Sequence, residues 1–220
     1  MPAGPQSSDP DAALVAQARD GDRAALTELY RRYSSRGYNL ALRMLGDPWD
    51  AADVSQEAFI KAFGALKGFK GEARFSTWFH RIVVNAVYDH LRRRRLDPMD
   101  EEVLTRLSAP GGSGRLAGGI QWSVDPHTDG FSPTLREALL SLGEGFRAAV
   151  VLCDVLGFDY GEAAEILGVQ EGTIKSRIFR ARAQLASYLT EHGYDEPHRQ
   201  ETTSAAEPDP SPQRHTTDTD

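Results

Sequence analysis

Apolar side chains recur at three- and four-residue spacing across residues 77–91, so this stretch is predicted to be an amphipathic helix with one buried face. Ser76 stands directly before it, and a serine hydroxyl there can accept hydrogen bonds from the first free N–H groups of a helix. The predicted buried face consists of Phe79, Ile82, Val83, Ala86, Val87 and Leu91.

A second face of the same helix combines an aromatic ring, an amide and cations. It carries Trp78, Arg81, Asn85, Asp89 and Arg92, the last of which begins a run of four arginines. Arginines hold phosphates and a flat ring stacks on an unpaired base, so this mixture suits single-stranded nucleic acid. The alternative is an ordinary amphipathic helix with Trp78 in the core and arginines that complement the helix dipole. This stretch alone leaves both interpretations open.

Upstream of this stretch, apolar periodicity predicts helices over residues 9–19, 25–33, 38–45 and 47–68. Asp9 and Pro10 are typical of an N-cap and a first turn. A break at Ser34–Gly37 separates the second helix from the third. Asp47 and Pro48 give the fourth helix the same kind of start as the first.

The helix that starts at Asp47 is acidic on one side. Acidic residues in a first turn stabilise the helix dipole, which accounts for Asp47 and Asp50. Asp53 and Glu57 lie beyond that turn and are not explained in this way. We therefore expect a docking surface for a basic partner, formed by Asp50, Asp53, Gln56 and Glu57 around Val54 and Ile60.

Residues 97–131 interrupt the helical pattern with the run PGGSGRLAGG and further prolines, which is typical of a flexible linker. Gly112, Gly114 and Ala117 match a dinucleotide-binding fingerprint, but no βαβ unit is predicted around them, so we interpret the match as chance. The predicted fold is all-α, with two small helical domains joined by the linker. Its parts are a disordered N-terminus (1–8), a first domain (9–96), the linker (97–131), a second domain (132–189) and a disordered acidic tail (190–220).

The second domain carries the signature of a helix-turn-helix. Asp159 and Glu162 form a capping box for a short helix, Gly168 supplies the turn, and a longer helix runs from Glu171 to about Leu189. The stripe predicted to be buried on the longer helix is Ile174, Ile178, Ala181 and Leu185.

The first half of that longer helix has a basic outward face. The residues that face outward there are Thr173, Lys175, Ser176, Phe179 and Arg180. In helix-turn-helix proteins this end of the second helix reaches the base edges of DNA. The alternative is a helical hairpin with a solvated basic face. A short helix, a glycine turn and a basic face coincide here, and together they favour DNA binding.

The 220-residue chain has a formal net charge of −7, but the charge is unevenly distributed. Residues 190–220 contain eight acidic and two basic side chains. By contrast, Lys70–Arg95 has seven basic and two acidic residues, and Glu171–Gln184 has four basic and one acidic. An acidic total therefore does not exclude a DNA-binding surface.

Composition excludes several other classes. The lone Cys153 rules out a disulfide framework within the chain and indicates a thiol in a reducing cytosol. No apolar run approaches the roughly 20 residues of a membrane span, and the N-terminus lacks the parts of a signal peptide. The six histidines lack metal-ligand spacing, and no nucleophile–base pair is recognisable. We predict a cytoplasmic protein that is not an enzyme, with no cofactor, no metal and no membrane insertion.

Three segments together resemble bacterial sigma-70 family factors of the extracytoplasmic-function (ECF) type. Residues 47–63 resemble the region 2 helix that docks on the clamp of RNA polymerase, and residues 69–95 resemble the part that melts promoters and reads the −10 element. Residues 141–185 resemble region 4, which reads the −35 element. The likeness covers about 14–95 and 134–189, in the order the family has. The acidic tail has no counterpart in the minimal family pattern.

The resemblance implies roles for individual residues. Core polymerase docking falls on Asp50, Asp53, Gln56, Glu57 and Phe59. Contacts with the −10 element fall on Arg74, Trp78, Arg81, Asn85 and Arg92, with Asn85 at the pocket for an extruded base. Contacts with the −35 element fall on Thr173, Lys175, Ser176, Phe179 and Arg180.

The implied partners are core RNA polymerase, promoter DNA and an anti-sigma factor, and the implied activity is stress-responsive transcription initiation. Two other classes stay open at this point. An ordinary helix-turn-helix repressor or activator would bind duplex DNA unaided and would not need the acidic helix. A nucleotide-binding enzyme would depend on the glycine-rich segment at 111–119.

Overall fold

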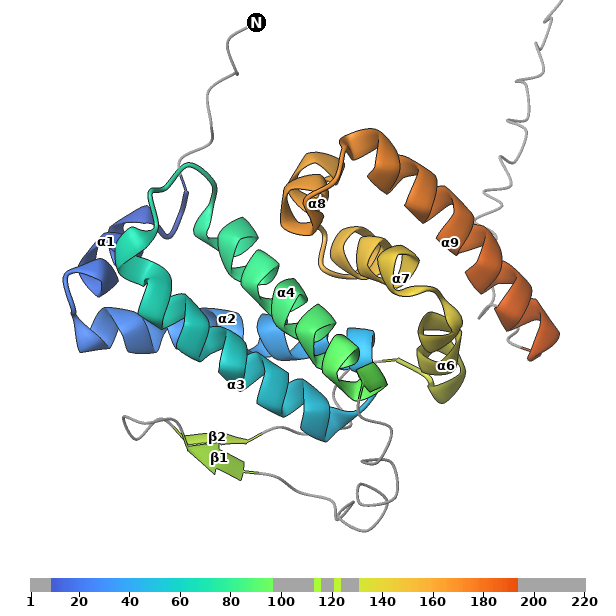
Figure 1. The fold of residues 1–220 in the computed structure, drawn as a ribbon, viewed down its shortest axis with the longest axis horizontal. Helices are drawn as coiled ribbons and strands as arrows, with labels where there is room; N and C mark the ends of the chain where they lie inside the picture. The colour runs from blue at the N-terminus through green and yellow to red at the C-terminus, as the bar shows by residue number, and fades with distance from the viewer. Residues whose placement is uncertain (1–8, 97–112, 116–120, 124–130, 194–220) are drawn as a thin grey trace, which may run out of the picture.

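Two groups of helices make up the described part of the chain, which in this computed structural model comprises residues 9–96, 113–115, 121–123 and 131–193 (Figure 1). In the first group, α2 packs against α1, α3 and α4, and α3 packs against α4. This group contains α1 (Ala12–Arg19), α2 (Arg23–Leu45), α3 (Pro48–Ala65), the short 3₁₀ helix η1 (Leu66–Gly68) and α4 (Phe75–Leu96).

The second group lies beside the first, and its longest helix, α9, packs against α6, α7 and α8. The chain turns sharply between α8 and α9 at Gly168, whose φ of 63° is in the left-handed region that glycine adopts without strain. The group contains α6 (Pro133–Ser141), α7 (Glu144–Val150), the π-helical turn η3 (Val151–Val155), α8 (Tyr160–Leu167) and α9 (Glu171–Glu191). The predicted helix-turn-helix is therefore confirmed as α8–turn–α9.

Several helix ends follow the predicted local signals. Asp47 caps α3 by accepting hydrogen bonds from the backbone N–H groups of Trp49 and Asp50, at 2.8 and 2.9 Å. Asp159 and Glu162 form the predicted reciprocal capping box at the start of α8. Ser132 caps α6 by accepting a hydrogen bond from the backbone N–H of Leu135 at 3.2 Å. These ends depend on residues within one turn of each other, which is why the sequence alone predicts them.

The predicted break at Ser34–Gly37 is wrong, because α2 is continuous from Arg23 to Leu45. Gly37 is buried where α4 passes close to α2, and a Cβ atom there would lie 3.1 Å from the ring of Phe79. This glycine therefore permits a close approach of two helices and does not mark a turn.

α4 begins earlier than expected, at Phe75, so Ser76 lies inside the helix and does not cap it. Oδ2 of Asp9 accepts a hydrogen bond from the backbone N–H of Phe75 at 2.7 Å, and Oδ1 of the same side chain accepts one from the N–H of Asp11 at 3.0 Å. The hydrogen-bond acceptor for the first backbone N–H of α4 is thus a side chain 66 residues away in the sequence.

Two three-residue strands, β1 (Ser113–Arg115) and β2 (Gln121–Ser123), pair antiparallel within the segment predicted as a linker. An antiparallel pair is not a βαβ unit, so it gives no support to a dinucleotide-binding site around Gly114. The rest of that segment, the predicted disordered N-terminus and residues 194–220 lie outside the described residues. With this small addition, the all-α fold of two helical parts is confirmed.

The two groups of helices are in contact. α8 packs against α4, and α2 contacts α6, α7 and η3. Phe158, which precedes α8, lies edge-on against the buried His80 of α4, with ring centroids 4.8 Å apart. A single core cluster contains buried residues from both groups. The surfaces proposed to bind DNA therefore belong to parts that pack together in this structure.

Candidate nucleic-acid interface

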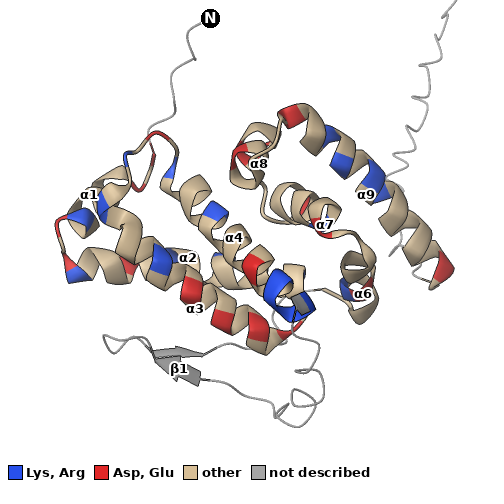
Figure 2. Cartoon of the chain, in the orientation of Figure 1, with Lys and Arg blue, Asp and Glu red and all other residues tan. Residues whose placement is uncertain are grey.

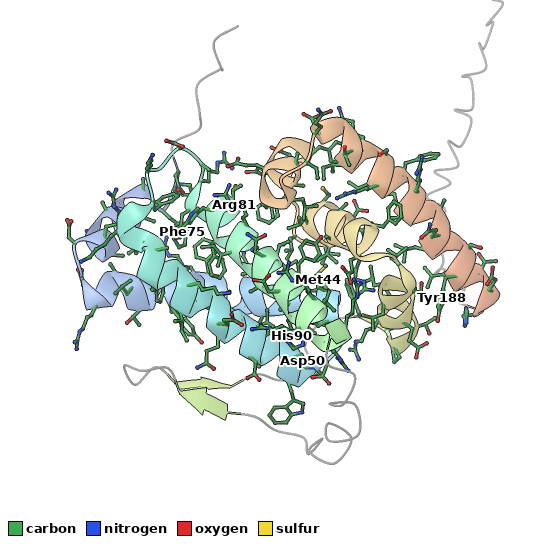
Figure 3. The ribbon with its side chains drawn as sticks, in the orientation of Figure 1. Met44, Asp50, Phe75, Arg81, His90 and Tyr188 are labelled. Carbon is green, nitrogen blue, oxygen red and sulfur yellow. The ribbon has the colours of Figure 1, made fainter. Side chains whose placement is uncertain are left out.

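The outward face of α4 presents two polar side chains and part of an aromatic ring. Arg81, labelled in Figure 3, and Asn85 are exposed, and their four-residue spacing places them one turn apart on the same side of the helix. Trp78, one turn before Arg81, is half-buried, and its ring centroid lies 4.9 Å from that of Phe69 and 5.7 Å from that of Phe75. Trp78 thus packs on the core and still reaches the surface next to the polar pair.

The other two arginines expected on this face already have carboxylate partners. Nη1 of Arg74 lies 3.1 Å from Oε1 of Glu162 in α8, and Arg92 pairs with Asp89 one turn before it. Ion pairs between exposed side chains contribute only about 0–1 kcal/mol. DNA phosphates can therefore replace Glu162 or Asp89 at small cost. For Arg74 this means that its ion pair with α8 breaks.

The acidic side of α3 faces the arginine run at the end of α4, so red and blue segments adjoin there in Figure 2. Oδ2 of Asp50 lies 3.1 Å from Nη1 of Arg94. The same oxygen lies 3.2 Å from Nε2 of His90, and Figure 3 shows Asp50 and His90 next to each other. The Asp50 side chain is only 14% exposed as a result. A docking partner therefore reaches Asp50 only by displacing these α4 side chains.

Glu57 is engaged in the same way, at 2.7 Å from Lys61 and 3.2 Å from Arg93. Hydrogen bonds from Lys61 and then from Arg93 lower the pKa of the Glu57 carboxyl, so its charge is maintained. Asp53 is exposed and has no cationic partner among the described residues, and Gln56 beside it is half-exposed. Asp53 is thus the most accessible carboxylate of the predicted docking surface.

The assignment of Phe59 to direct polymerase contact is wrong, because its ring lies in the core. Phe59 is 2% exposed and packs against Tyr30 and Phe79, with centroid distances of 4.8 and 4.6 Å. The large exposed apolar side chains of α3 are Trp49 and Ile60. Trp49 was missed, although its spacing to Asp53 and Ile60, four and eleven residues, places all three on one side of a helix.

The predicted recognition helix α9 presents its side chains as expected. Lys175, Ser176, Phe179 and Arg180 are exposed and Thr173 is half-buried. The predicted stripe faces the core, with Ile174, Ile178 and Ala181 buried and Leu185 partly buried against it.

Partners inside the protein restrain some of the outward side chains of α9. Lys175 pairs with Glu171 one turn earlier at 2.8 Å, and the hydroxyl of Ser176 donates to the backbone carbonyl of Thr173 at 2.9 Å. Arg180 has no carboxylate partner in the described part of the chain. A phosphate or a guanine can bind Arg180 without displacing an internal ion pair.

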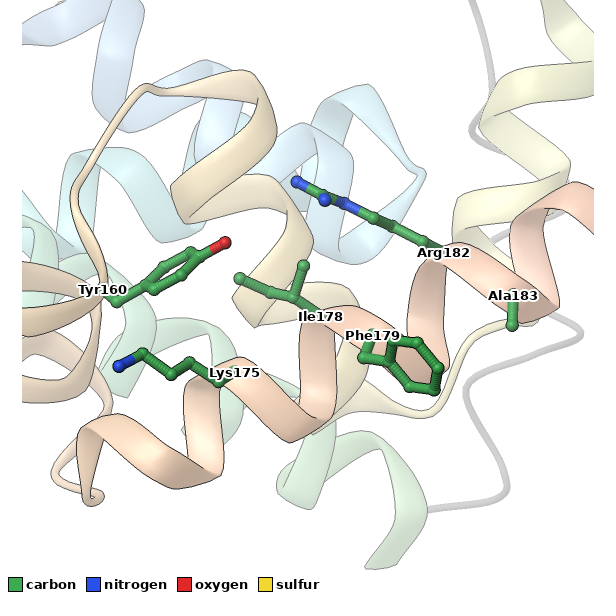
Figure 4. Close-up of a pocket in the computed structure, with 6 residues that line it drawn as sticks. All are labelled: Tyr160, Lys175, Ile178, Phe179, Arg182 and Ala183. Carbon is green, nitrogen blue, oxygen red and sulfur yellow. The ribbon is translucent and has the colours of Figure 1, made fainter.

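A groove with a volume of about 530 Å³ runs between α8 and α9 and is lined by Tyr160, Lys175, Ile178, Phe179, Arg182 and Ala183 (Figure 4). Phe179 is 77% exposed, unusually high for an aromatic ring. Arg182, which the sequence analysis missed, is held by two hydrogen bonds to Asp154 at 2.7 and 3.0 Å. The arrangement offers an apolar contact and cations to the same ligand, as DNA-reading helices do.

Two titratable side chains, His80 and Cys153, are fully and partly buried, respectively. The His80 ring is fully buried, and desolvation lowers its pKa to about 4, so it is neutral near pH 7. Desolvation and then the neighbouring Asp154 raise the pKa of the Cys153 thiol to about 11. A thiol with that pKa is a poor nucleophile at neutral pH. Within the described ranges, no group of three or more His, Cys, Asp and Glu residues is placed to hold a metal ion.

A membrane span is likewise not seen in the part of the chain that the structure describes. Each helix there is either too short or too polar to cross a lipid bilayer.

Arg147 is a buried cation that the sequence analysis missed, although it interrupts the apolar stretch of α7 and η3. Its guanidinium donates to the backbone carbonyl oxygens of Met44, at the end of α2, and of Leu140 and Leu142, at the end of α6. The last carbonyl groups of a helix lack intrahelical partners and carry the negative end of its dipole. Arg147 therefore joins the two groups of helices.

Replacing this cation tests its contribution to stability. Arg147→Met is expected to lower the free energy of unfolding by about 2–3 kcal/mol, because buried carbonyl groups lose charge-assisted hydrogen bonds. Urea denaturation followed by circular dichroism measures the change. Arg19→Met, at an exposed position of α1, is the matched control. Equal stability of the two variants would show that Arg147 does not hold the groups together.

Comparison with known proteins gives these surfaces a family. A model of sigma-70 region 2 matches residues 29–96, which include α3 and α4, and a model of sigma-70 region 4 matches residues 133–185, which include α8 and most of α9. The chain is therefore a two-region protein of the sigma-70 class.

Relatives over most of the chain narrow the class. The chain is 38% identical to ECF RNA polymerase sigma factor SigE of Mycolicibacterium smegmatis over 84% of this chain and 70% of that protein. It is 34% identical to RNA polymerase sigma-H factor of Pseudomonas aeruginosa over 83% of this chain and 95% of that protein, and 35% identical to the ECF RNA polymerase sigma-E factor of Escherichia coli over 78% and 90%. The chain belongs to the ECF group of the sigma-70 family.

Solved structures agree with the fold. The structure of CnrH in complex with the cytosolic domain of CnrY matches with a TM-score of 0.59 and 28% identity, covering 82% of this chain and 97% of that one. The sigma factor RpoE in complex with the anti-sigma factor NepR from Bartonella quintana matches with a TM-score of 0.57 and 25% identity, covering 74% and 96%.

Proposed function

We propose that this protein docks on core RNA polymerase, recognises the −10 and −35 elements of promoters and promotes strand opening for transcription initiation. The observation that supports the proposal is that two helices of one chain present exposed faces of different chemistry. α4 presents Arg81, Asn85 and part of Trp78, which suit unpaired bases, whereas α9 presents a basic face typical of duplex recognition.

The two helices have complementary tasks in this mechanism. α9 anchors duplex DNA, with Lys175, Ser176, Phe179 and Arg180 as the proposed −35 contacts and Thr173 supporting them. α4 captures bases of the −10 element as they leave the duplex. Extruding a base costs a few kcal/mol, and stacking it on an aromatic ring returns about 1–3 kcal/mol. Because the two terms are comparable, capture holds the promoter open without a catalytic step, and we assign no enzymatic activity.

The proposed functional units are the two predicted domains, 9–96 and 132–189, and they pack together in the structure. Arg74 contacts Glu162 across the two units, so binding of −10 DNA by Arg74 requires that this ion pair opens. Docking on polymerase uses Asp53 and Gln56 first. Asp50 and Glu57 join only when basic groups of polymerase replace Arg94 and Arg93.

Regulation is proposed by analogy with the matched structures. The sigma factor RpoE of Bartonella quintana is described in complex with the anti-sigma factor NepR. We infer that an anti-sigma factor likewise controls this protein in response to stress. Core polymerase and promoter DNA are the other proposed partners, and all of these interactions take place in the cytoplasm.

Promoter-specific transcription with core polymerase tests the proposal. Core enzyme alone transcribes linear genomic fragments without a defined start, and addition of this protein is expected to give discrete start sites. A repressor or activator that binds duplex DNA by itself would bind the same fragments without core polymerase and would create no start sites. Deletion of residues 111–119 would abolish the activity of a nucleotide-binding enzyme but is expected to preserve these start sites.

Arg180 tests the assignment of α9 to the −35 element. Arg180→Ala is expected to weaken promoter binding of the assembled holoenzyme by about 1–2 kcal/mol, in the lower part of the range for a bidentate arginine–guanine contact. Electrophoretic mobility shift with promoter fragments measures the effect. Arg19→Ala, which removes an exposed arginine from α1, is the matched control. An Arg180 variant that binds as tightly as this control would remove Arg180 from the interface.

A further inference from the structure

The acidic segment that follows α9 lies outside both matched regions, so family membership does not explain it. Residues 194–220 carry seven carboxylates against two arginines, a net charge of −5. Carboxylates spaced along a chain are negatively charged, as the phosphates of a DNA strand are, and both can pair with the same cations. The segment is covalently attached to the helix that is proposed to bind DNA, at Gly193.

α9 is a suitable counterpart for this segment. It carries four cations against two carboxylates, and its basic residues form the blue segments along the helix in Figure 2. Lys175, Arg180 and Arg182 are exposed, and Arg182 is held by Asp154 of η3. Arg180 has no carboxylate partner within the described residues, and Lys175 has only Glu171 of the same helix. The exposed Phe179 stands next to Arg180 and adds an apolar contact.

The arginine run at the end of α4 is already neutralised within the described residues. Each arginine of the run at the end of α4 has a carboxylate partner inside the protein: Arg92 pairs with Asp89, Arg93 with Glu57, Arg94 with Asp50 and Arg95 with Glu144. A carboxylate of the acidic segment gains less there, because it must displace an existing partner. Arg180 of α9 carries no such penalty, because it has no carboxylate partner among the residues that the structure describes.

The geometry allows the contact. Arg180 lies about 20 Å and Lys175 about 27 Å from Gly193 along α9, at about 1.5 Å per residue. The 27 residues after Gly193 span up to about 90 Å when extended. Glu207 and Asp209 are therefore far enough along the segment to reach both cations. A tethered segment acts at an effective concentration of the order of millimolar, so weak ion pairs suffice.

We propose that residues 194–220 bind the basic face of α9 and compete there with DNA phosphates. The competition rests on the proposed function of α9 as a DNA-binding helix, whereas the contact itself does not. The segment lowers the affinity of the free protein for DNA in general. A promoter held by polymerase and by the −10 contacts displaces the segment, so the competition favours promoters over other DNA.

Zero-length carbodiimide crosslinking of the full chain tests the contact directly. The sequence has four lysines, of which Lys175 is in α9 and Lys61, Lys67 and Lys70 are in the first group of helices. Crosslinks from carboxylates of 194–220 are expected to concentrate on Lys175 and to disappear at about 300 mM salt. The Glu171–Lys175 crosslink, across 2.8 Å, shows that Lys175 reacts. Two results would overturn the proposal. The first is a Glu171–Lys175 crosslink without any crosslink from 194–220 to Lys175, and the second is an even distribution of the 194–220 crosslinks over the four lysines.

A second measurement tests the competition with a mixed-sequence duplex of about 25 base pairs, a length that spans the site. The probe variant keeps the full length and replaces the seven carboxylates of 194–220 by amides. It is expected to bind the duplex about three- to tenfold more tightly than the natural chain at about 50 mM salt, and equally at about 300 mM. When Arg180→Gln is added to both proteins, the affinity gain of the amide variant is expected to be smaller. Arg180 is the cation for which the segment and the DNA compete, and it is then absent.

The outcomes separate the two proposals. An undiminished gain in the Arg180→Gln background would mean general charge repulsion, and the contact would be refuted. If Arg180→Gln does not weaken binding of the amide variant to the duplex, the DNA-binding role of α9 fails. The crosslinks to Lys175 still decide in that case whether the segment binds α9.

Discussion

Asp53→Lys is expected to abolish co-purification of the protein with core RNA polymerase. Asp53 is the exposed carboxylate of the acidic face of α3, and no cation is paired with it in the described structure. A lysine there places like charges against a basic docking surface, which costs several kcal/mol. A loss of about 4 kcal/mol corresponds to about a thousandfold in affinity. Pull-down of core enzyme with tagged protein measures the effect.

Asp53 gives a sharper test than its neighbour Asp50. Asp50 is covered by His90 and Arg94, so a lysine at position 50 would also disturb the packing of α3 against α4. Desolvation and then the nearby Asp50 charge raise the pKa of Asp53, so its removal relieves a repulsion and is tolerated by the fold.

The control for this prediction is Glu137→Lys, which makes the same charge change at an exposed position of α6. Both variants are expected to keep the helical content of the natural protein by circular dichroism. Normal binding of core polymerase by Asp53→Lys would place the docking surface elsewhere on the molecule.

Features encoded within one or two helical turns could be predicted from the sequence. The cap at Asp47, the capping box at Asp159 and the glycine turn at Gly168 depend on near neighbours, and the structure shows all three. The outward face of α9 followed from the same kind of pattern, since burial of Ile174 and Ile178 fixes which side chains remain outside.

Features that depend on distant segments could not be predicted. Gly37 looked like a breaker because the approach of Phe79 is visible only in three dimensions. The hydrogen bond from Phe75 to Asp9 links residues 66 positions apart, and the ion pair of Arg94 with Asp50 links residues 44 apart. Phe59 was placed among the polymerase contacts by the family resemblance alone, whereas its spacing to Ala52, Ser55 and Ala62 puts it on the buried face of α3.

The contact between the two helical parts was missed for the same reason. A glycine-rich linker predicts that two domains can separate, but it does not predict whether they pack. His80 falls in the first predicted domain and Phe158 in the second, and the contact between their rings joins the two. The helices that carry the proposed −10 and −35 contacts are therefore held together in this structure.

Asn85→Ala is expected to slow promoter opening by about 10- to 100-fold while docking on polymerase and −35 binding are unchanged. Asn85 is exposed on α4, two turns beyond Trp78 on the same side, so its amide can hydrogen-bond the edge of an extruded base. Loss of such contacts costs about 1–3 kcal/mol. Alanine favours the helix, so α4 itself is not weakened.

The matched control is Gln17→Ala, which removes an exposed side-chain amide from α1. Trp78→Ala is a poorer test, because the half-buried ring packs against Phe69 and Phe75 and its removal disturbs the core. Unfolding of the first group of helices by Trp78→Ala would show a structural role for the ring and would say nothing about Asn85.

A promoter that is already unpaired across the −10 element separates strand capture from duplex binding. The unpairing cost is then already met, so the opening defect of Asn85→Ala is expected to be largely rescued. The preference for a particular −10 base is not expected to return, because the amide that reads the base is still absent. Permanganate reactivity of thymines follows opening in natural and variant complexes. Equal reactivity and equal base preference on the duplex promoter would remove Asn85 from the mechanism, whereas a defect that persists on the unpaired promoter would mean that Asn85 acts before strand opening.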